Sequence, residues 1–114
     1  MCGVAVLNGA EYEFFHHAPP FIKAGGTEEQ VQGLRLIGQA IFPKTLFTQT
    51  ENDAADLTFQ MTRNIKVDPE LMQRLQKELG STDTVELVSV IAAYNMVSRF
   101  LIALDVNPED HPPV

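Results

Sequence analysis

Two residues able to carry acid–base chemistry stand four positions apart in the segment EYEFFHHAPPF, residues 11–21. On a helix, Glu13 and His17 would share one face, with their Cβ atoms about 5–6 Å apart. A carboxylate at that distance can orient an imidazole and raise its basicity, as a general base requires. The spacing therefore indicates a catalytic pair, and a purely structural hydrogen-bonded pair is the alternative.

The surroundings of this pair favour proton transfer over metal binding. On a helix, His16 points about 100° away from His17, so the two do not clamp one ligand. Zinc needs three or four converging ligands, and only Glu13, His17 and either His16 or His111 are available. The Pro-Pro pair that follows frees carbonyl groups at the end of a helix, where a protonatable group is favoured. We predict no metal and no cofactor.

Two further candidates lie near the C-terminus. Arg99 stands in an almost charge-free segment, so we expect a nearly buried guanidinium that must pair with an acid or a ligand carboxylate. An ion pair with Glu11 or Glu13 and the binding of a substrate carboxylate both remain open. With Tyr94 and His16, Arg99 is a candidate for holding an anionic substrate group, and it is the best suited of the three because it can bind a carboxylate through two hydrogen bonds.

The amino-acid composition limits the classes of partner and the compartment that we expect for this protein. The net charge is −7, and the eight basic residues are scattered, so a nucleic-acid interface is not expected. Cys2 is the only cysteine, which excludes an internal disulfide and any CxxC motif. The start of the chain lacks the basic residues of a signal peptide, and no uninterrupted apolar run of 18 residues marks a membrane span. We predict a cytoplasmic protein that does not bind membranes.

The elements that must position these residues are all predicted to be helical, in a single domain over residues 1–114. The TEEQ sequence at 27–30 reads as a capping box, and Asp68 followed by Pro69 is a typical helix start. We expect about six helices, with the first and last long ones packed together and the nearly charge-free last one also shared with another subunit. The main ones are expected over 4–17, from Thr27 to before Pro43, over 51–65 with Thr50 as cap, from Asp68 to Gly80, and over 84–104.

These motifs resemble those of the carboxymuconolactone decarboxylase and alkylhydroperoxidase D-like superfamily, in particular its cysteine-free branch. The branch signature reads like Y-E-W-x-x-H, with a glycine eight residues after the histidine. The segment VELVSVIAAYNMVSRFLIALDV is similar to the family's closing helix, and the resemblance covers nearly the whole chain. The matching residues are Tyr12, Glu13, Phe14, His17 and Gly25, then Tyr94 and Asn95 ahead of Arg99.

The resemblance implies an all-α, alkylhydroperoxidase D-like homo-oligomer and a lyase or isomerase type of chemistry. The peroxidase branch carries C-x-x-C-x-x-x-H, and here Ala10 and Glu13 stand at the two cysteine positions, so we predict no thiol peroxidase activity. We expect a cofactor-free enzyme acting on a small organic acid, lactone or enolisable carbonyl compound. The alternative is a non-catalytic oligomerising or small-ligand-binding member, since the upstream acid of the peroxidase branch would lie before Met1.

Overall fold

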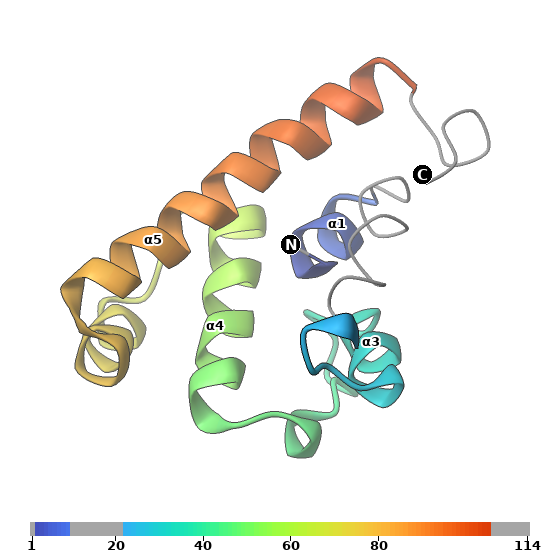
Figure 1. The fold of residues 1–114 in the computed structure, drawn as a ribbon. Coiled ribbons are helices and arrows are strands. Elements are labelled where there is room, and N and C mark those ends of the chain that lie inside the picture. The colour runs from blue at the N-terminus through green and yellow to red at the C-terminus, as the bar shows by residue number, and fades with distance from the viewer. Residues whose placement is uncertain (1, 10–21, 106–114) are drawn as a thin grey trace.

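The computed structural model describes residues 2–9 and 22–105, and every regular element in these ranges is a helix. The helix α5 crosses α4 and α1 along one side of the molecule, and α3 lies beyond them (Figure 1). The all-α fold class is therefore confirmed for the described residues, while the total of about six helices and the oligomer remain predictions. The elements are α1 (Cys2–Asn8), α3 (Glu28–Leu34), the 3-10 helix η1 (Lys44–Leu46), α4 (Gln49–Phe59), the π-helix η2 (Gln60–Asn64) and α5 (Pro69–Ala103).

The first helix is shorter than the sequence pattern indicated. It ends at Asn8, and Gly9 has a φ of +68°, the left-handed conformation that commonly follows a helix C-terminus. A continuous helix from Val4 to His17 is therefore wrong. The expected packing of the first helix against the last is confirmed, since α1 contacts both α5 and α4.

The helix α3 begins as predicted and ends early. Thr27 and Gln30 form the capping box, with hydrogen bonds of 3.0 and 3.1 Å in the two directions. Beyond Leu34 the backbone continues in successive i to i+3 turns, and Gly38 has a φ of +83°. The prediction of a helix reaching to Pro43 is therefore wrong, since α3 ends at Leu34 and the left-handed Gly38 is incompatible with a continued α-helix.

The helix α4 begins two residues earlier than predicted, at Gln49. Thr48 is the N-cap: its hydroxyl accepts from the Glu51 N–H at 3.2 Å, and Glu51 accepts from the Thr48 N–H at 2.8 Å. Thr50 lies inside the helix and is not the cap. After Phe59 the chain becomes the π-helix η2, and Ile65 takes a φ of +67° with its side chain 84% exposed. The α-helix predicted over 51–65 therefore ends at Phe59, and a π-helix continues it to Asn64.

The helix α5 starts at the predicted signal and bends at the predicted glycine. The Asp68 side chain caps it, Pro69 occupies its first turn, and Gly80 adopts φ +83° and ψ +167° within it. The Thr84 hydroxyl donates to the Gly80 carbonyl at 2.7 Å, which supports the bend. The core cluster comprises Val4, Leu57, Leu71, Leu75 and Ile91.

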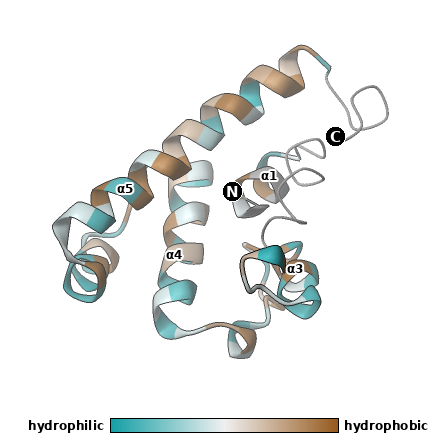
Figure 2. Ribbon diagram, viewed as in Figure 1, coloured by the Kyte–Doolittle hydropathy of each residue, from teal (hydrophilic) through white to brown (hydrophobic). Residues whose placement is uncertain are grey.

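The second half of α5 buries only one of its faces. Thr84, Ile91 and Ser98 are buried at a spacing of seven residues, whereas Val85, Met96 and Phe100 are each more than 60% exposed. Figure 2 shows apolar segments recurring along the length of this helix. Among the described elements, α1 and α4 cover only one side of this half of α5.

Candidate functional site

Three of the five sequence-predicted site residues lie outside the described part of the chain. These are Glu13, His16 and His17, so whether they meet one another remains a prediction. The other two, Tyr94 and Arg99, are both on α5. The site can therefore be built from its α5 side, and from the end of α1, which leads into the segment that carries Glu13.

A network of hydrogen bonds centred on Asn95 joins three helices. The Asn95 carboxamide oxygen accepts from the Asn8 side chain at 2.9 Å and from Arg99 Nη1 at 2.7 Å. Its nitrogen donates to the Thr62 hydroxyl and to the Ile91 carbonyl, both at 3.0 Å. This Asn95 network therefore ties the end of α1 and the π-helix η2 to the middle of α5.

A second arginine reaches the same end of α1. Arg63, in η2, donates from Nη2 to the carbonyl of Leu7, one residue before the network member Asn8. A cation is favoured there, because the last carbonyls of a helix lack backbone partners and carry partial negative charge. Arg63 thus binds the C-terminal turn of α1 directly, whereas Arg99 is linked to it through Asn95.

The environment of Arg99 differs from the sequence-based expectation. The side chain is exposed rather than nearly buried, and Nη1 donates to both the carbonyl and the carboxamide oxygen of Asn95. Among the described residues, no carboxylate pairs with either Arg99 or Arg63. An ion pair of Arg99 with Glu11 or Glu13 falls outside the described residues. The two guanidinium groups are therefore positioned by neutral partners, which leaves their positive charge uncompensated within this part of the chain.

Tyr94 plays a different part in the structure from Arg99. Its half-buried ring packs against the core cluster, on the side of α5 that faces the other helices. The structure therefore gives Tyr94 a packing role, and its role in substrate binding remains a prediction.

The π-helix next to the network adds local strain. Single-turn π-helices occur frequently at functional sites. Here η2 supplies Thr62 and Arg63, and it ends at Ile65, a β-branched residue with positive φ. Such a conformation costs of order 1–3 kcal/mol and persists where the surroundings enforce it. The strain coincides with the turn that delivers Arg63 to α1.

A separate ion pair joins α4 to the start of α5. Asp53 is 2% exposed, and its Oδ1 accepts from Gln49 at 3.1 Å and from Arg74 at 3.4 Å. The hydrogen bond that Arg74 donates to Asp53 raises the pKa of Arg74 above its ordinary value. Among the described residues, the other oxygen of Asp53 is buried and has no hydrogen-bond partner. The pair holds α4 against the first half of α5.

Sequence reasoning missed most of the Asn95 network. Asn8, Thr62 and Arg63 were not singled out, because each is an ordinary polar residue in its own segment. The available signal was Asn95 itself, an amide within the nearly charge-free stretch 87–98, where a polar side chain needs a partner. Among the described residues, no group of three His, Cys, Asp or Glu side chains converges as a metal site would require.

Comparison with known protein families, with curated proteins and with solved structures gave no match to this chain. The resemblance to the carboxymuconolactone decarboxylase superfamily therefore rests on the sequence motifs alone. By length and composition, α5 would also be able to cross a membrane, but a single helix of this kind is weak evidence for a span.

Proposed function

We propose that the protein is a cofactor-free acid–base enzyme of the lyase or isomerase type, acting on a small organic acid, lactone or enolisable carbonyl compound. The observation that carries the proposal is the pair of arginines without carboxylate partners among the described residues, Arg63 and Arg99, beside the end of α1. The segment that follows this end contains the Glu13 and His17 pair. In this proposal, the segment after α1 carries the proton carrier toward the arginines that hold the anionic group.

In the proposed chemistry, the arginines bind the substrate and the Glu13–His17 pair transfers the proton. Arg99 would hold the substrate carboxylate, since a guanidinium can bind it through two hydrogen bonds, and Arg63 would add positive charge at the end of α1. His17 would take a proton from the carbon next to the carbonyl group and return it, because its ordinary pKa of about 6.5 suits both directions. Glu13 would stabilise the imidazolium formed in between.

Chain connectivity supports the pairing of these two groups. Glu13 follows Asn8 by five residues, and a fully extended chain of that length spans at most about 18 Å. Asn8 is itself hydrogen-bonded to Asn95, which also binds Arg99. The Asn95 network therefore fixes the point from which the Glu13 segment departs.

Exchange of substrate protons with solvent tests the proposal. The purified protein would be incubated in D₂O with small 2-oxo acids and lactones, and deuterium uptake beside the carbonyl group followed by proton NMR. His17→Ala should slow uptake by about 10²- to 10⁴-fold, the usual contribution of general acid–base catalysis. Arg99→Gln should raise KM for the oxo acids more than it lowers kcat. Gln76→Ala, a change at an exposed position of α5, is the control. Equal rates for His17→Ala and wild type would remove His17 from the mechanism.

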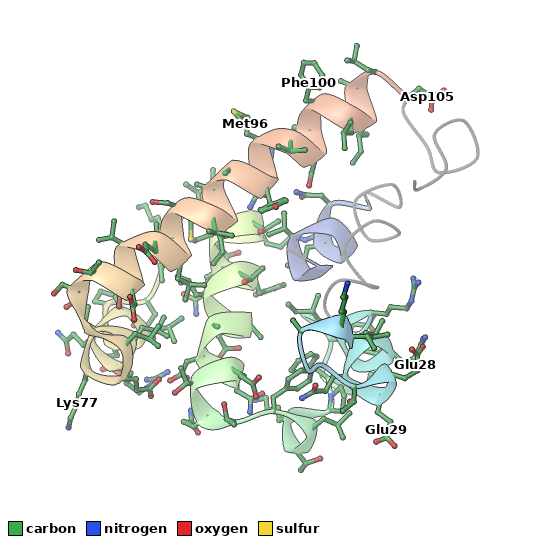
Figure 3. All side chains as sticks on the ribbon, viewed as in Figure 1. Glu28, Glu29, Lys77, Met96, Phe100 and Asp105 are labelled. Atoms are coloured by element: carbon green, nitrogen blue, oxygen red, sulfur yellow. The ribbon has the colours of Figure 1, made fainter. Side chains whose placement is uncertain are left out.

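A non-catalytic, oligomerising role is the second candidate, and the exposed apolar side of α5 favours it. Val85, Ser89, Ala93, Met96 and Phe100 form one stripe, here called the outer face of α5. In Figure 3, Met96 and Phe100 project away from α1. We propose that a second copy of the chain covers this face in a cytoplasmic homo-oligomer, whichever of the two functions holds.

A further inference from the structure

A cavity of about 280 Å³ lies on the far side of α4 from the core, between this helix and the turns that follow α3. Its lining includes Ile37, Phe42, Lys44, Ala55, Asp56 and Phe59. Small-molecule sites in proteins begin at about 300 Å³ and combine an apolar lining with a few polar groups. None of these residues belongs to the Asn95 network, so the cavity is a second, separate place where a ligand would fit.

The apolar walls of the cavity are held in place by close packing. The ring of Phe42 stacks on that of Phe47, with centroids 5.3 Å apart and planes 9° from parallel. The ring of Phe59 lies against the backbone of Gly38, where an added Cβ atom would come within 2.7 Å of the ring. Gly38 also has a positive φ, so both its conformation and its contact with Phe59 require glycine. The aromatic lining is thus preorganised.

Two opposite charges flank this apolar lining. Lys44 begins η1 on one wall, and Asp56 projects from α4 on the other. Both side chains are exposed, and the structure gives neither an ion-pair partner among the described residues. A ligand with one positive and one negative group can satisfy both, whereas a ligand with one charge leaves the other protein charge without a partner.

We propose that this cavity binds a small aromatic zwitterion, of the chemical class of the aromatic α-amino acids. Asp56 receives the ammonium group, Lys44 receives the carboxylate, and the ring packs on the apolar wall formed by Phe42 and Phe59. Aromatic pairs contribute about 0.5–1.5 kcal/mol beyond the area that they bury. The small side chain of Ala55 leaves the room that the ring occupies.

Binding of L-phenylalanine to the full chain, measured by isothermal titration calorimetry, tests the proposal. The comparison compounds are 3-phenylpropionate, which lacks the ammonium group, phenethylamine, which lacks the carboxylate, and L-alanine, which lacks the ring. Each should bind about tenfold more weakly than L-phenylalanine: the first two because they lose a hydrogen bond to a charged group, and L-alanine because it leaves the apolar wall uncovered.

Charge-removing variants separate the two ends of the ligand. Lys44→Met should weaken L-phenylalanine about tenfold and leave phenethylamine unchanged, and Asp56→Asn should do the reverse with 3-phenylpropionate as the unaffected compound. Lys77→Met and Asp83→Asn make the same chemical changes at exposed positions of α5 and serve as controls. Ala55→Leu, with its helical content checked by circular dichroism, should abolish binding by filling the cavity.

Two results would overturn the proposal. One is the lack of saturable binding of L-phenylalanine at millimolar concentration. The other is binding that both Lys44→Met and Asp56→Asn leave at the wild-type affinity. Neither result bears on deuterium exchange by His17, so the cavity and the proposed enzyme activity succeed or fail independently.

Discussion

At the scale of single residues, Asn95 makes the largest number of connections between helices. Its carboxamide makes hydrogen bonds with α1 and η2, besides two within α5. The residue is half-buried, and its part-buried partners Asn8 and Thr62 would each lose a hydrogen bond if the amide were removed. The network therefore contributes to stability and to the placement of Arg99 at the same time.

Removal of the Asn95 side-chain amide should destabilise the folded protein. Asn95→Ala should lower the free energy of unfolding by about 2 kcal/mol, because several partly buried partners lose their hydrogen bonds together. Urea unfolding followed by circular dichroism measures the loss. Gln76→Ala, an exposed truncation on the same helix, should change stability by less than about 0.5 kcal/mol. Equal midpoints for the two variants would mean that the network adds nothing to stability.

For the ion pair between Asp53 and Arg74, we expect the first substitution to destabilise the protein and the second to restore stability. Arg74→Met should lower the urea midpoint, because it leaves a buried carboxylate without its cation. Adding Asp53→Asn should recover much of the loss, since the remaining charge is then removed as well. Because the folded state raises the pKa of Arg74, the contribution of its charge to stability is present at neutral pH and is lost as the pH rises through that pKa. A double variant less stable than Arg74→Met alone would contradict this account.

At the scale of the elements, the bend at Gly80 decides how the two halves of α5 lie. Its φ of +83° and ψ of +167° fall in a region that only glycine occupies readily. No atom lies within 4 Å of where a Cβ atom would stand, so sterics from neighbours do not matter there. Any substitution acts through the backbone alone.

Substitution of Gly80 should therefore be costly whatever small residue replaces it. Gly80→Ala and Gly80→Asn should both lower the free energy of unfolding by about 1–3 kcal/mol. Asparagine tolerates the left-handed helical region but not this one, so it should give no relief over alanine. Thermal and urea unfolding provide the measurement. A fully stable Gly80→Asn variant would show that the residue adopts the left-handed helical conformation instead.

Local signals predicted helix starts well and helix ends poorly. The capping box at Thr27 and the Asp68–Pro69 start were read correctly, because caps depend on neighbours in sequence. Thr48 was missed although T-x-x-E was present, since Thr50 also precedes the acidic run. The early end of α3 at Leu34 was not predicted, because no glycine or proline stands directly after it in the sequence.

At the scale of the whole molecule, the sequence indicated the helical class and the packing of α1 on α5, but not which side of α5 is covered. Its second half is apolar on several sides, so periodicity alone did not show that Thr84, Ile91 and Ser98 face inward. The candidate site was also predictable only in part from the sequence. Arg99 stood out as a lone charge, whereas its partners Asn95 and Asn8 are brought together only by the fold.

The outer face of α5 should hold a second copy of the chain. Its stripe runs through the small residues Ser89 and Ala93, which allow two helices to approach closely, with Val85, Met96 and Phe100 available to pack beside them. A contact about one helix face wide needs roughly 1,000 Å² of buried surface in total to be stable. The stripe spans positions 85–100 of the helix, which is long enough for such a contact.

Charges placed on this face should separate the copies without unfolding them. Met96→Glu with Phe100→Glu should weaken self-association by about 10²- to 10³-fold, since an unpaired charge buried in an interface costs about 3–5 kcal/mol. Sedimentation velocity would follow the oligomer, and circular dichroism the fold. Gln73→Glu with Gln76→Glu adds the same charge to exposed positions in the first half of α5 and should leave association unchanged. A wild-type chain that sediments as a monomer at micromolar concentration would contradict the oligomer.

A lipid surface is the other contact that the outer face could make, because the same apolar side chains and the same length of helix serve either contact. If the monomer sedimented with phospholipid vesicles, and the Met96 and Phe100 changes released it, the outer face would belong to a lipid surface.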